Sequence, residues 1–500
     1  MNRNREGGFG RSVARAWVRG LERAPNRDAA KRGRMVAARR WRGQIDSTLG
    51  TTYRVRTYRS SVVPAASGTK ESLMRHHSRH AFALGLVAAA LLVPGLAAAS
   101  ATISDPATAG FAPDRLVRID RSLQGYVDRN EVPGVVALIA RRGQIVYHKS
   151  FGDRDVDANA PMSTDVIFRI ASMTKPIASV ALMTLWEEGR FLLRDPVAKY
   201  LPEFADMKVR LPVEPGDDAR GPFRTVRAQK PITIQHLLTH TAGLANTYRG
   251  ATRGLYNDLR QNRKPDGTVG DYVAALAKLP LNFEPGERWE YGPATDVVGR
   301  LVEVLSGMTL DEYLSKKIFG PLGMQDTHFY LPSKKLPRFA ALYRPDDAGK
   351  IALQEKPDEQ SRWVREPHVY FSGAGGLVST TSDYFRFHQM MLNGGELDGV
   401  RILGPRTVRL MTVNHTGDRA VWLRGEGFGF GLGYSVSVDL GRSAVPSAEG
   451  TYGWGGAYCT VFWVDPEDEL IGILMTQVRP YTHLNIRQDF QTLTYQALVD

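Results

Sequence analysis

Between residues 113 and 152 the apolar positions change from helical spacing to strand spacing. Residues 113–129 predict a helix, because four apolar side chains fall on one face at intervals of three or four: Leu116, Ile119, Leu123 and Tyr126. Residues 135–152 then carry two apolar runs on either side of Arg142-Gly143. Two such runs around a glycine turn predict a β-hairpin.

The middle of the chain has the pattern of helices. Residues 173–190 predict a helix whose inner face consists of Ile177, Val180, Ala181, Thr184 and Leu185. From about residue 195 to 410, further helical segments are separated by loops rich in proline and glycine. Two polar stretches, 211–231 and 331–366, interrupt this series and are expected to be loops.

The C-terminal part of the sequence returns to strands. Three apolar segments each predict one strand: 427–438, 452–464 and 469–477. The run Asp465-Pro466-Glu467-Asp468 predicts the turn between the last two. A closing helix is expected to present four apolar side chains on one side: Ile486, Phe490, Leu493 and Ala497.

This order of elements predicts an α/β (α+β) fold. Strands near both ends of the chain with helices between them imply one antiparallel sheet, formed by residues of about 110–170 and about 425–500 and flanked by helices. The residues from about 195 to 410 would then form a mostly helical domain inserted into the sheet domain. Together these segments would make residues 100–500 one globular unit.

Residues 74–99 have the layout of a secretory signal peptide. Met74 opens a short basic start, an apolar run follows, and the segment ends in the small residues Ala97-Ala98-Ala99. The apolar run is short for a membrane span. We therefore expect cleavage before Ser100, a periplasmic or secreted protein, and membrane contact only during export.

Residues 1–73 allow two interpretations. They are rich in arginine and have no sustained apolar periodicity, so they are either a basic, disordered arm or an upstream extension from a misassigned start codon. A signal peptide functions at the N-terminus of a chain, and this favours the second interpretation.

Charge and composition exclude several classes of function for residues 100–500. The whole chain carries +13, but residues 1–73 hold 17 Lys and Arg against 5 Asp and Glu, and residues 74–99 add two arginines, so the remainder is close to −1. A nearly neutral domain gives no reason to expect nucleic acid as a partner.

One cysteine excludes an internal disulfide. The sequence has no HExxH, CxxC or strand-linked GxGxxG motif, so no metal or organic cofactor is expected.

The candidate chemistry begins at Ser172-Met173-Thr174-Lys175, where the apolar helix starts. Residues three apart share a helix face, so the Lys175 amine can reach the Ser172 hydroxyl. A serine needs such a base to become a nucleophile. The S-x-x-K pattern alone is weak, since Ser67-Gly68-Thr69-Lys70 matches it too. That copy precedes the export signal and opens no apolar helix, so it is discarded.

In its context, residues 168–191 (FRIASMTKPIASVALMTLWEEGRF) resemble the nucleophile helix of the serine β-lactamase-like superfamily, which includes the penicillin-binding DD-peptidases and family VIII carboxylesterases. Further segments resemble the family's framework in the expected order: 233–244, 284–305, 318–329, 372–383 and 452–464. The resemblance covers about 110–500. It implies the β-lactamase/transpeptidase-like fold, with Tyr291 as the active-site tyrosine that carries the serine proton to the leaving group.

Two departures from the lactamase pattern favour the esterase branch. The family's Tyr-x-Asn is Tyr291-Gly292-Pro293 here, and proline has no side-chain amide to hold a β-lactam. The Lys-Thr-Gly motif is replaced by Trp454-Gly455-Gly456, which the resemblance assigns to substrate binding without the lysine that grips a carboxylate. A tryptophan suits an apolar acyl or alcohol group instead.

We therefore expect a serine hydrolase that cleaves small-molecule esters through an acyl-serine. The resemblance implies that the backbone N–H groups of Ser172 and Ala457 form the oxyanion hole. One alternative is β-lactam or D-amino-acid peptide cleavage, with an amide substrate, at the same site. An alternative of another class is a non-catalytic, penicillin-sensing protein. The oligomeric state and the natural ester do not follow from the sequence.

Overall fold

The computed structural model describes residues 103–211, 224–245 and 252–500, which all belong to one unit of the chain, Leu92–Asp500. The expected signal peptide and the segment 1–73 lie outside the described residues, as does most of the polar stretch 211–231. Those interpretations stay predictions. Within the described ranges, every helix is too short or too polar to span a lipid bilayer.

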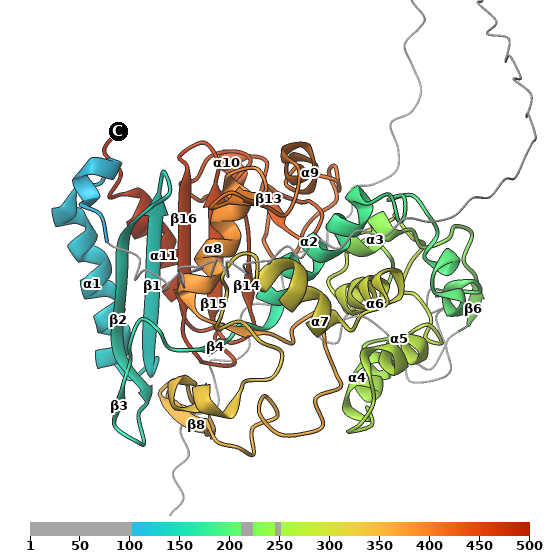
Figure 1. Ribbon diagram of the computed structural model, residues 1–500, viewed down its shortest axis with the longest axis horizontal. Helices are drawn as coiled ribbons and strands as arrows, with labels where there is room; N and C mark the ends of the chain where they lie inside the picture. Colours follow the sequence, from blue (N-terminus) through green and yellow to red (C-terminus); the bar gives the residue numbers. More distant parts are fainter. Residues whose placement is uncertain (1–102, 212–223, 246–251) are drawn as a thin grey trace, which may run out of the picture. The chain divides into compact units, whose positions relative to one another are not determined.

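The largest sheet of the described residues is antiparallel and has the strand order β12-β13-β14-β15-β16-β1-β2-β3 (Figure 1). Its strands are β1 (Gly134–Arg141), β2 (Gln144–Asp155), β3 (Ala160–Pro161), β12 (Phe428–Phe430), β13 (Ser435–Ser437), β14 (Tyr452–Gly456), β15 (Thr460–Asp465) and β16 (Leu470–Met475). In its middle, β1 pairs with β16, and Val136 lies opposite Met475. The N- and C-terminal segments therefore share one sheet, as predicted.

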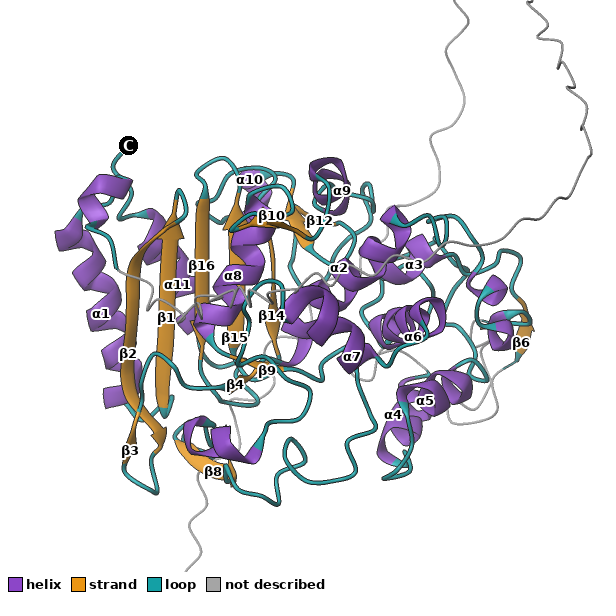
Figure 2. Ribbon diagram, in the orientation of Figure 1, coloured by secondary structure: helices purple, strands orange, loops and turns teal. Residues whose placement is uncertain are grey.

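Helices flank this sheet and fill most of the chain between its two halves (Figure 2). They are α1 (Pro113–Asp128), α2 (Thr174–Glu187), α3 (Ile234–Leu238), α4 (Arg253–Gln261), α5 (Val269–Leu276), α6 (Ala294–Ser306), α7 (Leu310–Leu314), α8 (Thr381–Leu392), α9 (Pro405–Met411), α10 (Leu440–Ser443) and α11 (Ile486–Tyr495). Four strand pairs lie outside the large sheet: β4 (Phe168–Arg169) with β9 (Val378–Ser379), β5 (Lys208–Arg210) with β6 (Thr225–Arg227), β7 (Leu342–Pro345) with β8 (Ile351–Glu355), and β10 (Glu396–Leu397) with β11 (Val400–Arg401).

The hairpin of β1 and β2 follows from its turn residues. Arg142 and Gly143 have φ angles of 52° and 75°. Two successive residues with positive φ make the tight turn whose twist matches that of antiparallel strands, and glycine adopts this conformation without strain. The predicted hairpin is confirmed, and its turn lies where the sequence placed it.

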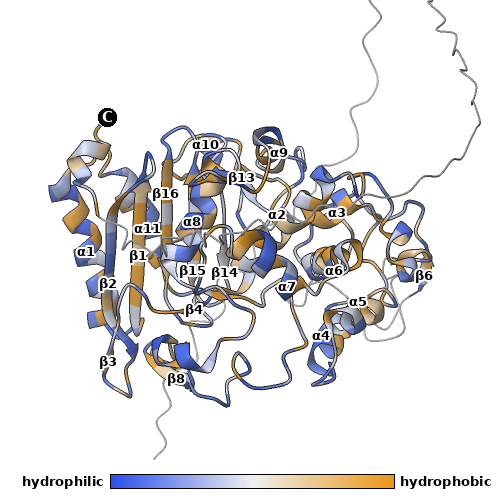
Figure 3. Ribbon diagram, in the orientation of Figure 1, coloured by the Kyte–Doolittle hydropathy of each residue, from blue (hydrophilic) through white to orange (hydrophobic). Residues whose placement is uncertain are grey.

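Strand β1 separates two hydrophobic cores. Successive side chains of a strand point to opposite faces. Val136 and Leu138 pack in the core that contains α2 and α8, whereas Val135 and Ala137 pack in the core that contains α1 and α11. Burial on both faces explains the continuous apolar run of this strand, which Figure 3 shows together with that of β16.

The predicted faces of the first and last helices are confirmed. In α1, the four expected side chains are buried: Leu116, Ile119, Leu123 and Tyr126. In α11 and the turn after it, Ile486, Phe490 and Ala497 are fully buried, and Leu493 is partly buried against them.

Two of the expected C-terminal strands are wrong as single strands. Residues 427–438 form β12 and β13 with a turn at Gly433 (φ 99°), and residues 452–464 form β14 and β15 with a turn at Cys459 (φ 67°). In each segment the apolar residues continue through the turn, so no polar residues mark the position of the turn in the sequence. The stretch 331–366 is also not only a loop, because it contains the hairpin of β7 and β8.

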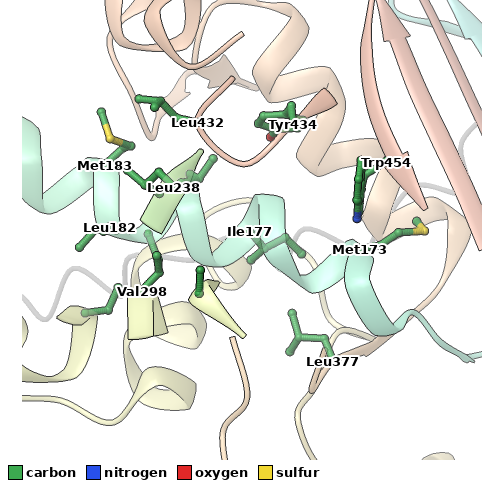
Figure 4. Close-up of a cluster of buried hydrophobic side chains, with 14 of the residues drawn as sticks. Met173, Ile177, Leu182, Met183, Leu238, Val298, Leu377, Leu432, Tyr434 and Trp454 are labelled. Carbon is green, nitrogen blue, oxygen red and sulfur yellow. The ribbon is translucent and has the colours of Figure 1, made fainter. Parts of the chain in front are cut away.

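Helix α2 is buried on all sides rather than on one face. Its residues from Thr174 to Met183 are all buried, and Figure 4 shows Ile177 and Met183 surrounded by side chains from other segments, among them Leu238 and Val298. A helix that is apolar all round lies in the interior of a protein. The prediction therefore included too few buried residues, because it assigned burial to one face of the helix. The helix that begins beside Ser172 is a rigid central element.

Arg169, three residues before Ser172, anchors the start of this region. Its side chain is fully buried and donates to the carbonyl oxygen of Ala340 at 2.6 Å and to Glu355 Oε1 at 2.8 Å. Burial opposes the charged form of Glu355, yet the Arg169 guanidinium holds the pKa of this carboxyl below its ordinary value. Gln477 adds a bond to the Arg169 backbone N–H at 3.1 Å, so the sheet fixes this segment as well.

We predict that Arg169→Met lowers the free energy of unfolding by about 3 kcal/mol, because it leaves a half-buried carboxylate and a buried carbonyl without their donor. Urea unfolding followed by circular dichroism measures the change. The control is Arg129→Met, which removes an exposed ion pair with Glu131 (2.9 Å) and should cost less than about 1 kcal/mol. Equal losses in the two variants would contradict the structural role of Arg169.

Candidate active site

Ser172 lies in a single 3₁₀ turn, η2 (Ala171–Met173), that leads directly into α2. Ala171 has a φ of 44°, an uncommon conformation for a residue with a Cβ atom. Strand β14 approaches this turn so closely that a Cβ on Gly456 would lie 2.4 Å from the Ile170 carbonyl oxygen. Glycine at this position is therefore what lets the strand and the serine turn come together.

The structure brings the predicted serine, lysine and tyrosine into direct contact. The Ser172 Oγ lies 2.7 Å from the Tyr291 hydroxyl and 3.2 Å from Lys175 Nζ. The Lys175 amine also lies 4.7 Å from the centroid of the Tyr291 ring. One hydroxyl therefore has two groups capable of proton transfer within hydrogen-bond distance.

Lys175 is buried, with 4% of its surface exposed. Its amine donates to the carbonyl oxygen of Ala374 at 2.6 Å, in the loop of residues 372–376 that precedes β9. This bond and the one to Ser172 direct the amine toward the serine, because a buried ammonium group must be hydrogen-bonded.

Asp296, on the first turn of α6, holds that loop in place. Its Oδ1 accepts from the Ser372 hydroxyl at 2.6 Å and from the Ala374 backbone N–H at 3.1 Å. Burial raises the pKa of the Asp296 carboxyl, while these donors and the nearby Lys175 act in the opposite direction. Gly373 packs against α6 so tightly that a Cβ would lie 2.5 Å from the Thr295 carbonyl oxygen. Asp296 thus positions Ala374, and Ala374 positions Lys175.

Aromatic rings form the wall behind Tyr291. The Trp454 Nε1 donates to the Tyr291 hydroxyl at 3.4 Å, and the ring centroids of these two residues lie 5.3 Å apart. The ring centroid of His240 lies 5.0 Å from that of Tyr291. Burial, together with the charge of Lys175, lowers the pKa of His240 to about 3, so its imidazole is neutral at physiological pH.

The two predicted oxyanion donors face the same cleft. Ala457 follows β14 at the turn into β15 and lines a pocket together with Ser172 and the predicted binding residues Trp454, Gly455 and Gly456. In the described part of the chain, neither the Ser172 nor the Ala457 backbone N–H donates a hydrogen bond outside the regular elements. The two residues therefore line one pocket, and the oxyanion role of their N–H groups stays a prediction.

Two pockets meet at Ser172 and Tyr291. The larger has a volume of about 580 Å³ and extends from Lys175 toward Arg263, Tyr330 and Arg362. The smaller, of about 330 Å³, lies along β14 and is lined by Trp454, Ala457 and Tyr481, among others. A cleft with two compartments on either side of a serine can hold the two parts of a substrate that is cleaved between them.

Sequence reasoning did not single out Asp296, His240 or the arginines of the two pockets. His240 and Asp296 lie in segments that resemble the family, at 233–244 and 284–305. The available signal for Asp296 was an acidic residue on a helix whose neighbouring positions 297 and 298 are valine. The arginines come from separate parts of the chain, so only the folded structure brings them together.

The chain is similar to several known proteins. Residues 119–494 match the family model described as Beta-lactamase. The chain is 36% identical over 373 residues to Protein Rv1367c of Mycobacterium tuberculosis and 31% identical over 380 residues to Esterase EstB of Burkholderia gladioli; each match spans 72% of this chain and 89% of the relative. Among solved structures, EstCE1, a hydrolase with promiscuous acyltransferase activity, is similar with a TM-score of 0.65 and 27% identity, covering 76% of this chain and 98% of its own.

We predict that Asp296→Ala slows the labelling of Ser172 by a fluorophosphonate at least about tenfold, because the loop of residues 372–376 loses the bonds that position Ala374 and Lys175. Asp296→Asn should stay within about threefold of the wild type, since a carboxamide oxygen can still accept from the Ala374 N–H. The rate constant for labelling, followed by mass spectrometry, measures both.

Thermal unfolding provides the control for this pair of variants. A carboxyl whose pKa is raised on folding costs stability once the pH exceeds that pKa, so Asp296→Asn should be at least as stable as the wild type at pH 8. Any advantage of the Asn variant should shrink as the pH falls through that pKa. Equal labelling by the wild type and Asp296→Ala would contradict the positioning role.

Proposed function

Because this chain belongs to the β-lactamase family, we propose that it is a serine hydrolase that cleaves acyl esters through a covalent acyl-serine intermediate. The observation that carries the proposal is the position of the Ser172 Oγ, within 2.7 Å of the Tyr291 hydroxyl and 3.2 Å of Lys175 Nζ, where the two pockets meet. A small-molecule ester is the substrate class, and no cofactor is required by this chemistry.

In the acylation step, the Ser172 Oγ attacks the ester carbonyl carbon. Tyr291, kept close to the charge of Lys175, accepts the serine proton as the new C–O bond forms. The tetrahedral intermediate then collapses, the bond to the alcohol breaks, and Tyr291 returns the proton to the departing alkoxide. The Lys175 amine lies 4.7 Å from the centroid of the Tyr291 ring, beside the group that carries the proton.

The deacylation step reverses these roles with water as the nucleophile. Tyr291 takes a proton from the water, the water oxygen attacks the acyl carbon, and the proton passes to the Ser172 Oγ as the acyl bond breaks. The carboxylic acid leaves and the serine is restored. In both steps the carbonyl oxygen becomes negative, and the N–H groups of Ser172 and Ala457 would stabilise it by roughly 3–4 kcal/mol for each donor.

Two substituted positions support an ester over a β-lactam. Pro293 caps α6 with no side-chain amide at the place where the family pattern has asparagine. Trp454 occupies the lysine position on β14, with its indole ring against Tyr291. The similarity to EstB and EstCE1, an esterase and a hydrolase by name, points in the same direction.

A non-catalytic binding protein with this fold is less well supported. Such a protein has no need of a serine in contact with both a tyrosine and a lysine whose amine must be removed from water at a cost in free energy. Export through residues 74–99 to the periplasm or beyond remains part of the proposal and is compatible with an enzyme that acts on external esters.

We predict that Ser172→Ala abolishes ester turnover and fluorophosphonate labelling, and that Lys175→Ala and Tyr291→Phe each lower kcat at least about 10³-fold, roughly 4 kcal/mol. The Lys175→Ala/Tyr291→Phe double variant should be little worse than the poorer single variant, because the two groups act as a unit. Steady-state kinetics on a short-chain aryl ester measure the losses.

The matched control is Tyr434→Phe, which removes a buried hydroxyl with no hydrogen-bond partner among the described residues and lies outside both pockets. It should leave kcat within about threefold. Near-full activity of Tyr291→Phe, or losses that simply add in the double variant, would contradict the shared proton path even if Ser172 remained the nucleophile.

For the substrate class, we predict that short-chain aryl esters are hydrolysed at least about a hundredfold better than nitrocefin by kcat/KM, which corresponds to roughly 2.7 kcal/mol of differential transition-state stabilisation. The physical reason is the replacement of the lactamase asparagine and lysine by Pro293 and Trp454. Comparable values for the two substrates would overturn the assignment to esters.

A further inference from the structure

Arginines line both pockets beside Ser172. The larger pocket holds Arg260, Arg263 and Arg362, and the smaller holds Arg424, Arg479 and Arg487. Among the described residues that line the two pockets, Asp296 is the one with an acidic group, and its carboxyl accepts bonds from Ser372 and Ala374. Residues 100–500 have a net charge close to −1, so this positive charge is a local feature of the cleft.

In the larger pocket, aromatic rings orient the guanidinium groups of Arg263 and Arg362. The Arg263 guanidinium lies 3.7 Å from the centroid of the Tyr370 ring. The Arg362 guanidinium lies 4.7 Å from the Trp363 ring and donates to the Tyr458 hydroxyl at 3.0 Å. The ion pairs of the described residues include neither arginine. Ring stacking fixes each guanidinium while most of its N–H donors stay available.

These two arginines come from distant parts of the chain, and both lie near the Tyr330 side chain. Burial raises the pKa of Tyr330, and the guanidinium charges of Arg263 and Arg362 both act in the opposite direction. Tyr330 lines the pocket together with Tyr272 and Tyr370. Two cations converging on one wall of phenol rings make a site rich in hydrogen-bond donors and poor in negative charge.

The smaller pocket has a different character. Leu423, Trp454 and Pro480 give it apolar walls. Its Arg487 donates to the Tyr481 hydroxyl and lies over β14 so closely that a Cβ on Gly455 would touch it. An apolar group fits this pocket, whereas an anion fits the larger one.

We propose that the substrate of Ser172 carries an anionic group, and that Arg263 and Arg362 bind this group in the larger pocket. A guanidinium binds carboxylate or phosphate oxygens through paired, charge-assisted hydrogen bonds. The part of the ester on the other side of the scissile bond lies in the smaller pocket along β14. This inference rests on the proposed ester hydrolysis and adds the charge of the substrate to it.

The test compares two pairs of esters that differ by one negative charge. Monophenyl adipate against its methyl ester places the charge in the acyl part, and 4-(butyryloxy)benzoic acid against its methyl ester places it in the alcohol part. We expect the free acid of at least one pair to have a kcat/KM higher by on the order of tenfold or more, since one or two charge-assisted bonds are gained. The ratio of kcat/KM for the free acid to kcat/KM for its methyl ester, called here the acid-to-methyl-ester ratio, should fall as NaCl is raised from 0.05 to 0.5 M, because salt screens the attraction between charges.

Substitutions assign the preference to the larger pocket. Arg263→Gln and Arg362→Gln should each lower the acid-to-methyl-ester ratio at least about fivefold, and Arg263→Lys and Arg362→Lys should retain part of it because the charge remains. The matched control is Arg365→Gln, an exposed arginine three residues from Arg362 that lines neither pocket, and it should leave the ratio unchanged. A general loss of structure would lower both rates and preserve the ratio.

Three results would overturn the inference: equal or better hydrolysis of the neutral esters in both pairs, an unchanged ratio in both Gln variants, or loss of the preference in Arg487→Gln instead. The last would move the anion to the smaller pocket. Failure of the proposed function is a separate outcome, because then no ester of either pair is hydrolysed and Ser172 is not labelled by a fluorophosphonate.

Discussion

The Lys175 amine is buried at the beginning of α2, and a buried ammonium group requires hydrogen-bond acceptors that the surrounding chain must supply. α2 itself cannot provide them, because the helix is packed on all sides by apolar residues. The acceptors are the Ser172 hydroxyl and the Ala374 carbonyl, and the Tyr291 ring adds its negative face. The positions of these three groups are therefore tied to one charge.

This constraint joins parts of the chain that are far apart in sequence. Tyr291 is 119 residues from Ser172, and Ala374 is 199 residues from Lys175. α6 carries Asp296 and begins just after Tyr291, so one helix fixes both the tyrosine and the loop that receives the lysine. The site thus depends on the helical part of the chain packing on α2, and a loosened α6 would disturb both partners of the serine at once.

The features that could be predicted from the sequence are those that depend on the spacing of residues within one segment. The turn at Arg142-Gly143, the buried face of α1 and the pair Ser172–Lys175 each depend on neighbours a few residues apart. Tyr291 was found only through resemblance to a family, because nothing in its own segment indicates a contact with Ser172. The turns inside 427–438 and 452–464 were missed since apolar residues continue through them. Asp296 was not predicted, because it acts through hydrogen bonds to the loop of residues 372–376, which is distant in the sequence.

The electrostatics of the cleft change from its interior to its walls. In the interior, the Lys175 charge is accompanied by Asp296, and His240 stays neutral because burial and the lysine lower its pKa to about 3. A second cation in contact with Tyr291 would disturb the proton path, so a neutral imidazole suits that position. The walls, in contrast, carry Arg263 and Arg362, which stack on aromatic rings and form no direct ion pair among the described residues. Asp296 links the two regions, because the charges of Lys175 and Arg263 both oppose the rise in pKa that burial causes in its carboxyl.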